Sequence, residues 1–214
     1  MKTNTSEKTA KMVLTSLLTA LIFILAFVPF AGYIKIPVLA IQVTTVHIPV
    51  IIGSIILGPK YGAFLGGCFG LTSLINNTAQ PGITSFVFSP FIEVGEGLGG
   101  SPLSLIICFV PRILSGIVPY FVYIGMQKIM KKNRQPHPAS LMISGVAGSM
   151  TNTLLVMSMI YFFFGKQWAA AKNIAYEAVL GIIGSVVLIN GTIEAFIAAV
   201  ASSAVCLAIL KTKK

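Results

Sequence analysis

The sequence has very few charged residues. Charged side chains make up 9% of its 214 residues, whereas hydrophobic residues make up 56%, and the mean hydropathy is +0.92. So few charged side chains cannot cover the surface of a water-soluble globular protein of this length. The composition therefore excludes a soluble fold and predicts an all-α integral membrane protein that crosses the bilayer several times.

Acidic residues are the scarcest of the charged types. Five Asp and Glu stand against 15 Lys and Arg, a balance that in a soluble chain would suggest nucleic-acid binding. Here the basic residues cluster between long apolar runs, at positions where they would meet lipid headgroups. We therefore expect contact with the bilayer and no nucleic-acid partner.

The chemistry-bearing motifs of common enzymes are missing. The three cysteines lie singly in apolar runs, without the Cys-x-x-Cys spacing of a metal site or a disulfide framework. The sequence contains no Gly-Lys-Ser/Thr phosphate loop, no His-Glu-x-x-His and no Gly-x-Ser-x-Gly. We therefore expect no metal site, no cofactor and no catalytic centre.

What the sequence does contain is a series of apolar segments. Hydropathy, read with breaks at Pro, Gly and charged clusters, predicts a single domain, 1–214, with six spans. These are 12–30, 44–57, 61–77, 103–127, 139–163 and 179–209. The second and third are short, which suggests that they are tilted, broken or sheltered by protein.

The distribution of Lys and Arg predicts the orientation. Eleven fall on the side of the two termini: Lys2, Lys8, Lys11, Lys60, Lys128, Lys131, Lys132, Arg134, Lys211, Lys213 and Lys214. Only Lys35, Lys166 and Lys172 fall on the other side. The excess of positive charge in cytoplasmic loops predicts that both termini lie in the cytoplasm of the cell.

Two groups of small residues indicate close helix packing. Gly58, Gly62, Gly66 and Gly70 are spaced four apart, which favours packing inside the protein. Ser16 and Ala20 form a second small-xxx-small pair in the first span. This pair is suited to internal packing or to an external partner, and its spacing does not decide between them.

Two charged residues lie inside predicted spans, Arg112 and Glu194. A charge at mid-bilayer costs about 2.5–3.5 kcal/mol on insertion scales, so each needs a partner, water or a ligand. Lys128 follows Arg112 by 16 residues and Lys211 follows Glu194 by 17, which places both charges at the same depth, about 24–26 Å above the cytoplasmic end. We hypothesise that they face one outward-open cavity and pair when it is empty. A purely structural salt bridge is the alternative.

Further polar residues cluster near this depth. We expect them to complete the binding site together with an aromatic residue of the loop after the third span: Asn190, Asn152, Asn76, Asn77, His47 and Phe88. That loop, 78–102, reads as an extended segment that folds down as a lid, with a disordered connector as the alternative. Trp168, in the last predicted loop, is interpreted as an interfacial anchor, with lid duty as the alternative.

The chain resembles the substrate-binding S component of bacterial energy-coupling factor (ECF) vitamin transporters, over nearly all of its length. The features that carry the resemblance are the turn "LGPKYGAFLGGCFGL", the helix "CFVPRILSGIVPYFVY", six spans with basic edges and the first-span pair. In this family the pair is often Ala-x-x-x-Ala, and Ser16 replaces its first alanine. The segments "GPKYGAFLGGCFGLTSLINN" and "TSFVFSPF" look most like the pantothenate branch.

The resemblance implies a function. The S component would bind its vitamin from outside, dock through Ser16 and Ala20 on a transmembrane coupling subunit, and topple to release the vitamin inward. Two cytoplasmic ATPase subunits would hydrolyse the ATP. Pantothenate is favoured because a carboxylate with hydroxyl and amide groups suits Arg112 and the Asn side chains, while riboflavin, folate and other vitamins stay open.

Two other function classes stay open from the sequence. A self-sufficient secondary carrier or channel would use an Arg112–Glu194 pair as its gate and would transport without partners. An intramembrane enzyme would use Glu194 and His47, although no nucleophile or metal set accompanies them.

Overall fold

A computed structural model describes residues 2–29, 31–36, 41–130 and 136–212 of the chain. Its helices are α1 (Lys2–Phe27), α2 (His47–Leu57), α3 (Pro59–Ala79), α4 (Pro102–Ile129), α5 (Pro138–Ala171), α6 (Val179–Val186) and α7 (Thr192–Thr212). A five-residue π-helical segment, η4 (Val187–Gly191), joins α6 to α7 as one long helix. Each of the six predicted spans thus overlaps one helical segment, although the first and second also include residues outside α1 and α2.

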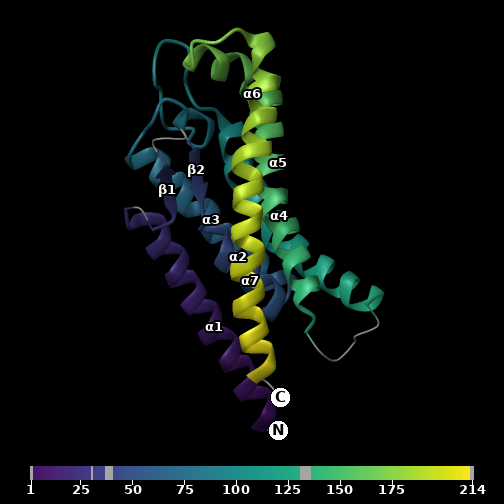
Figure 1. Ribbon diagram of the computed structural model, residues 1–214. Coiled ribbons are helices and arrows are strands. Elements are labelled where there is room, and N and C mark those ends of the chain that lie inside the picture. The colour runs from purple at the N-terminus through teal and green to yellow at the C-terminus, as the bar shows by residue number, and fades with distance from the viewer. Residues whose placement is uncertain (1, 30, 37–40, 131–135, 213–214) are drawn as a thin grey trace.

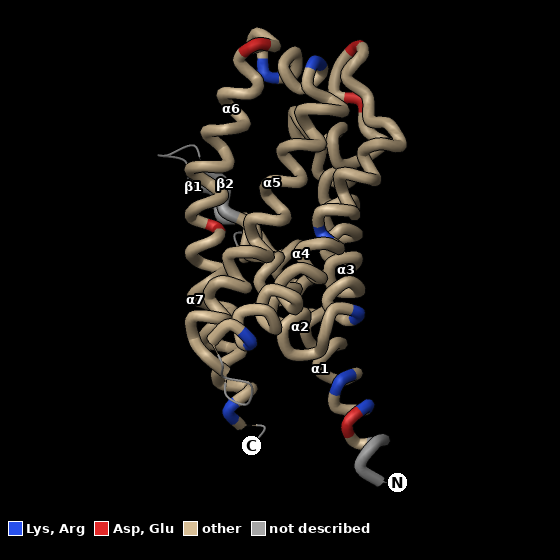
Figure 2. Tube along the Cα trace, turned by 90° about the vertical axis from the view of Figure 1, so that its right-hand side faces the viewer, with Lys and Arg blue, Asp and Glu red and all other residues tan. Residues whose placement is uncertain are grey.

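The helices form an elongated bundle with both termini at one end (Figure 1). The connections from α3 to α4 and from α5 to α6 lie at the opposite end. Charged residues gather toward the two ends and leave the middle of the bundle almost free of them (Figure 2). Large apolar side chains face outward from the helices, for example Phe162, Leu188 and Phe196, which are 77%, 73% and 69% exposed. This distribution is the one that a bilayer requires.

Four helical segments are long and apolar enough to cross a membrane, within the ranges that the structure describes. They are Ser6–Phe27, Pro102–Ile129, Pro138–Ala171 and Tyr176–Thr212. Helices α2 and α3, which correspond to the second and third predicted spans, are not among these four. Helix α2 has 11 residues, a rise of about 16 Å, and α3 has 21. The chain is a multi-pass membrane protein, and the count of six crossings stays a prediction.

A short hairpin between α1 and α2 was not predicted from the sequence. Strands β1 (Tyr33–Ile36) and β2 (Ile41–Thr44) pair antiparallel, with Tyr33 opposite Thr44. The segment had been assigned partly to a loop and partly to the second span, because its apolar residues look alike in a helix and in a strand. The hairpin packs beside α7 and η4.

The glycine face of α3 packs directly on α4. A Cβ atom on Gly62 would lie 1.9 Å from the carbonyl oxygen of Gly116, and one on Gly66 would lie 2.2 Å from that of Arg112. Gly70 comes almost as close, at 3.0 Å from the carbonyl oxygen of Cys108. The prediction of close internal packing is confirmed for these three glycines. Gly58 differs, because it caps α3 with a φ of 100° and has no neighbour within 4 Å.

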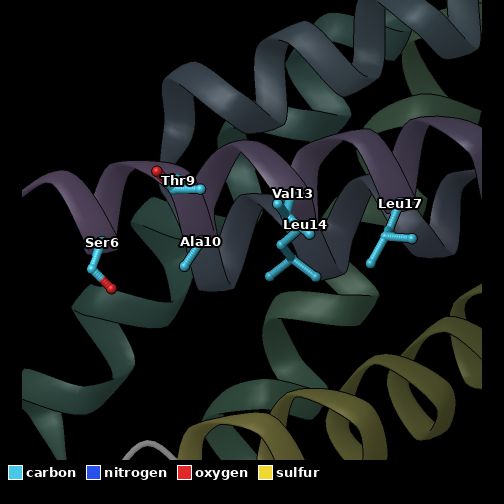
Figure 3. Close-up of a pocket in the computed structure, with 6 residues that line it drawn as sticks. All are labelled: Ser6, Thr9, Ala10, Val13, Leu14 and Leu17. Carbon is cyan, nitrogen blue, oxygen red and sulfur yellow. The ribbon is translucent and has the colours of Figure 1, made fainter.

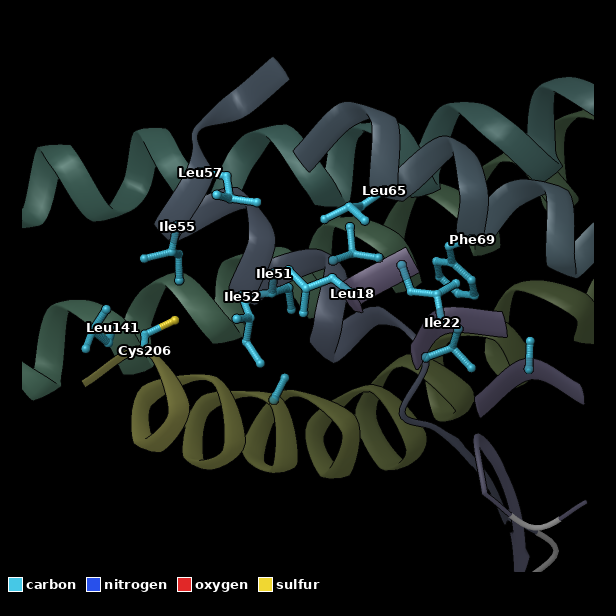
Figure 4. Packing of buried hydrophobic residues seen from close by; sticks show 14 residues of the cluster. Leu18, Ile22, Ile51, Ile52, Ile55, Leu57, Leu65, Phe69, Leu141 and Cys206 are labelled. Atoms are coloured by element: carbon cyan, nitrogen blue, oxygen red, sulfur yellow. The ribbon is translucent and has the colours of Figure 1, made fainter. Parts of the chain in front are cut away.

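Two apolar clusters surround the middle of the bundle. The first joins α1, α2 and α3, with contributions from α5 and α7, and includes Leu18, Ile22, Ile51 and Phe69 (Figure 4). The second lies toward the end opposite the termini. Its residues include Phe86, Ile107, Val156, Ile160, Phe164 and Trp168. Members of both clusters border one cavity.

Candidate ligand-binding cavity

A cavity of about 380 Å³ lies among α3, α4, α5, η4, α7, the hairpin and the loop 80–101. This volume lies within the range of binding sites for small organic ligands. Six of the eight predicted ligand-binding residues line it: Arg112, Glu194, Asn190, Asn152, Asn77 and Phe88. The structure therefore brings together polar groups that are up to 117 positions apart in the sequence, from Asn77 to Glu194.

Arg112 is buried, with 6% of its surface exposed. Its Nη1 donates a 2.7 Å hydrogen bond to the carbonyl oxygen of Ile107, and its Nη2 lies 3.4 Å from the Oγ of Ser73. The sequence explains the first bond. Pro111 has no backbone N–H to donate four residues back, so the carbonyl of Ile107 needs another donor, which Arg112 provides.

Two aromatic rings flank the guanidinium of Arg112. Its Cζ lies 5.5 Å from the ring centroid of Phe69 and 5.1 Å from that of Phe88. Rings at these distances stabilise a cation and fix the plane of the guanidinium group. The Nε atom of Arg112 is buried and has no hydrogen-bond partner among the residues that the structure describes. A buried cation is thus held in place with part of its hydrogen-bonding capacity unused.

Glu194 lies in the same cavity, as the comparison of depths predicted, but the expected ion pair is absent. Its Oε1 accepts a 2.7 Å hydrogen bond from the backbone N–H of Thr44, and its Oε2 accepts one of 3.3 Å from the Oγ1 of Thr153. Within the described ranges, the ion pair found is Lys11 with Glu7. The prediction that Arg112 and Glu194 pair when the cavity is empty is therefore wrong. The hairpin, which the sequence did not reveal, supplies the donor that Glu194 uses instead.

The three asparagines of the cavity differ in how they are bonded. Asn77 is part of the scaffold, because its Nδ2 donates to the carbonyl oxygen of Ser73 and its Oδ1 accepts from the Oγ of Ser85. The Oδ1 of Asn152 is buried and accepts no hydrogen bond. Asn190 lies in the π-helical segment η4, one helical turn before Glu194. Such segments are frequent at functional sites.

The loop 78–102 covers part of the cavity. Its segment Ser85–Val87 is a 3₁₀ turn, so the prediction of an extended segment is wrong. Phe86 and Val87 are fully buried, and the carbonyl oxygen of Phe86 accepts a 2.7 Å hydrogen bond from the Oγ of Ser104. Thr84 and Phe88 line the cavity on either side of this turn. The covering part of the loop is thus packed, and the alternative of a disordered connector is wrong for it.

Two predicted residues lie outside the cavity lining. The Nδ2 of Asn76 donates a 2.7 Å hydrogen bond to the carbonyl oxygen of Ala26, which ties α3 to the end of α1. His47 begins α2 and is 1% exposed, and neither of its ring nitrogens has a hydrogen-bond partner. Sequence position gives depth but not the direction of a side chain, so it could not show that these two residues lie outside the lining of this cavity.

Several lining residues were missed, and Trp168 was misplaced. Helix α5 runs to Ala171, beyond the predicted end at 163, so Trp168 lies on a helix and not in a loop. Its side chain is 5% exposed and lines the cavity. The signal was present, because 166–171 contains no Gly or Pro and three alanines. The others missed include Tyr33, Thr44, Thr153 and Lys172.

The predicted docking pair lies on the surface. Ser16 and Ala20 are both exposed on α1. A shallow groove runs along the same helix nearer its N-terminus, lined by Ser6, Thr9, Ala10, Val13, Leu14 and Leu17 (Figure 3). Apolar side chains there are open, with Leu17 62% and Val13 53% exposed. The pair therefore does not serve internal packing.

Comparisons with known proteins agree with these features. Residues 10–206 match the family model described as "ECF transporter, substrate-specific component". The pantothenic acid transporter PanT of Lactococcus lactis is 41% identical over 175 residues, which cover 81% of this chain and 80% of the relative. The pantothenate transporter PanT of Leuconostoc mesenteroides is 27% identical over 194 residues, covering 88% and 86%.

Proposed function

The chain belongs to the family of substrate-specific components of ECF transporters, and we propose that the ligand it captures is pantothenate. Both relatives are named for this vitamin or its acid. The proposal is supported most directly by one observation, the buried guanidinium of Arg112 in a cavity where no carboxylate among the described residues forms an ion pair with it.

The charges of the cavity suit a monoanion. Its lining contains two cationic residues, Arg112 and Lys172, and one acidic residue, Glu194. In their usual ionised forms they sum to +1, so a ligand with one carboxylate balances the site. A carboxylate also matches the guanidinium geometry, because the fork presents parallel N–H groups to two oxygens.

The rest of the lining suits the rest of the molecule. Pantothenate has an amide, two hydroxyl groups and a pair of methyl groups in addition to its carboxylate. The free Oδ1 of Asn152 is an acceptor for a hydroxyl or an amide N–H. Val156, Ile160 and Met157 supply an apolar wall for the methyl groups.

The transport cycle needs partners. We propose that both termini face the cytoplasm, that the six helical segments cross the membrane, and that the cavity receives the vitamin from outside. The exposed face of α1 around Ser16 and Ala20 would dock on a transmembrane coupling subunit. Two ATPase subunits would supply the energy, and toppling of the component would deliver the vitamin inward.

Binding and transport by the isolated chain test this function. We expect the purified protein in nanodiscs to bind pantothenate in isothermal titration calorimetry, with one site per chain. Mass spectrometry of freshly purified protein should detect the retained vitamin. In liposomes the chain alone should give no uptake, and uptake should require ATP and the partner subunits. Uptake by the chain alone would instead indicate a self-sufficient carrier.

A further inference from the structure

Lys172 occupies a fixed position at the outer end of α5. It is the residue that caps the helix, and its backbone N–H donates to the carbonyl oxygens of Trp168 and Ala169, each with an N to O distance of 3.2 Å. The next residue, Asn173, has a φ of 53° and turns the chain away from the helix. The side chain of Lys172 therefore starts from a well-defined point.

The ammonium group of Lys172 lies over an aromatic wall of the cavity. Its Nζ is 4.9 Å from the ring of Trp168, and both residues line the cavity. Trp168 is almost fully buried, whereas Lys172 is exposed. Lys172 thus stands where the cavity meets solvent. The neighbouring Gln167 joins this helix end to the covering loop, through a 3.3 Å hydrogen bond to the carbonyl oxygen of Gly97.

No carboxylate of the protein neutralises this lysine in the part of the chain that the structure describes. None lies within 4.0 Å of its Nζ, and Glu194 is held by Thr44 and Thr153. A lysine at a helix C-terminus is favoured by the helix dipole alone. That effect explains its presence at this end, but it requires neither the stacking on Trp168 nor the position at the mouth.

We propose that Lys172 is the residue that draws the carboxylate of the incoming ligand to the mouth of the cavity, before Arg112 holds it inside. This inference rests on the proposed function. A charge at the rim of a binding site acts mainly on the association rate and on its dependence on salt. Loss of a buried contact acts mainly on the dissociation rate. The two cationic residues therefore have separable kinetic effects.

The protein contains its own probe for this test. Trp168 is the single tryptophan of the chain and lines the cavity, so its fluorescence in stopped flow reports ligand arrival. We would compare wild type, Lys172→Gln and Lys166→Gln in nanodiscs of zwitterionic lipid. Lys166 is the matched control, because it is exposed on the same helix end and does not line the cavity. The ligands are pantothenate and pantothenol, in which a primary alcohol replaces the carboxylate.

For Lys172→Gln with pantothenate we expect an association rate about three- to tenfold lower, a flatter salt dependence and an unchanged dissociation rate. Binding of pantothenol by this variant, and of both ligands by Lys166→Gln, should match wild type. Equal slowing by the two variants would reduce the effect to net charge and overturn the proposal. Equal slowing of both ligands by Lys172→Gln would also overturn it, since packing on Trp168 would then explain the change.

Ligand binding by the wild-type protein distinguishes a failure of the role proposed for Lys172 from a failure of the assignment of pantothenate. If wild type binds pantothenate and Lys172→Gln binds it at the same rate, only the role of Lys172 fails. If wild type binds neither ligand, the assignment of pantothenate fails, and this inference fails with it. Melting temperatures of all three proteins show whether each variant is folded.

Discussion

Glu194 on α7 accepts a 2.7 Å hydrogen bond from the backbone N–H of Thr44, the last residue of β2. The two residues are 150 positions apart in the sequence. Thr44 pairs with Tyr33 across the hairpin, and both line the cavity. A buried carboxylate thus fixes one wall of the candidate binding site.

This bond predicts different results for two substitutions of Glu194. Glu194→Gln keeps an acceptor oxygen for Thr44, whereas Glu194→Leu removes it and leaves a buried N–H unpaired, at a cost of about 1–3 kcal/mol. Hydrogen exchange at the Thr44 amide should stay slow in the first variant and become fast in the second. Slow exchange in both would mean that the hairpin is held by other contacts.

Arg112→Met should abolish most pantothenate binding without unfolding the protein. Methionine fills a similar volume between Phe69 and Phe88, but it offers no charge and no donor to a carboxylate. The expected loss is about 10- to 100-fold in Kd. Arg112→Lys keeps the charge but lacks the paired N–H groups of the guanidinium, so its affinity for pantothenate should lie between those of wild type and Arg112→Met. Calorimetry measures the affinity, and unchanged affinity in a folded Arg112→Met protein contradicts the assignment.

The contact between α3 and α4 can be tested with adjacent glycines. Gly66→Ala places a methyl group 2.2 Å from the carbonyl oxygen of Arg112, so the helices must separate, which should destabilise the protein by about 1–3 kcal/mol. Gly67→Ala is the control, because no described atom beyond its own helical turn and chain neighbours lies within 4 Å of its Cβ position. It should be neutral or stabilising by up to about 1 kcal/mol. Thermal melting in detergent ranks the three proteins.

His47→Leu should leave ligand affinity unchanged and should not lower the melting temperature. The imidazole is buried, with neither ring nitrogen bonded, and replacing an unsatisfied polar group by an apolar one of similar size is neutral or stabilising. Calorimetry and thermal melting provide the measurement. A clear loss of affinity would show that His47 contributes to ligand binding although it does not line the cavity.

Ser16→Leu should separate binding from transport. Leucine at this exposed site of α1 would block close approach of a partner helix, so uptake with the coupling subunit and the ATPases should fall to background. Pantothenate binding by the isolated chain should remain. Ser158→Leu is the matched control, because Ser158 is exposed on α5. Equal uptake by both variants would place the docking surface elsewhere.

The helices and the cavity charges could be predicted because hydropathy and chain length fix depth. Counting from Lys128 and Lys211 placed Arg112 and Glu194 at one level, and both line one cavity. The spacing of Gly62 and Gly66 likewise predicted a close helix contact. Each of these inferences depends on distances along one helix, which follow directly from the number of residues between two positions.

The orientation of single side chains could not be predicted in this way. His47 and Asn76 have the right depth, but they point into the packed interior and toward α1. The hairpin was missed because its apolar residues suit a strand and a helix alike. The donors that Glu194 uses, the backbone N–H of Thr44 in the hairpin and the hydroxyl of Thr153 on α5, were both overlooked, and the ion pair with Arg112 was predicted in their place.

The contact between Gly66 and the backbone of Arg112 also limits how the cavity can evolve. Any larger residue at position 66 would move the backbone of Arg112, which lines the cavity, so this wall tolerates little variation. The wall formed by α5 and η4 contributes Asn152, Val156 and Asn190 to the lining, and at the glycine of η4, Gly191, an added Cβ would meet only side-chain atoms, the nearest at 3.3 Å. A related protein that imports a different acid would therefore differ mainly along α5 and η4, while its anion-binding wall would stay the same.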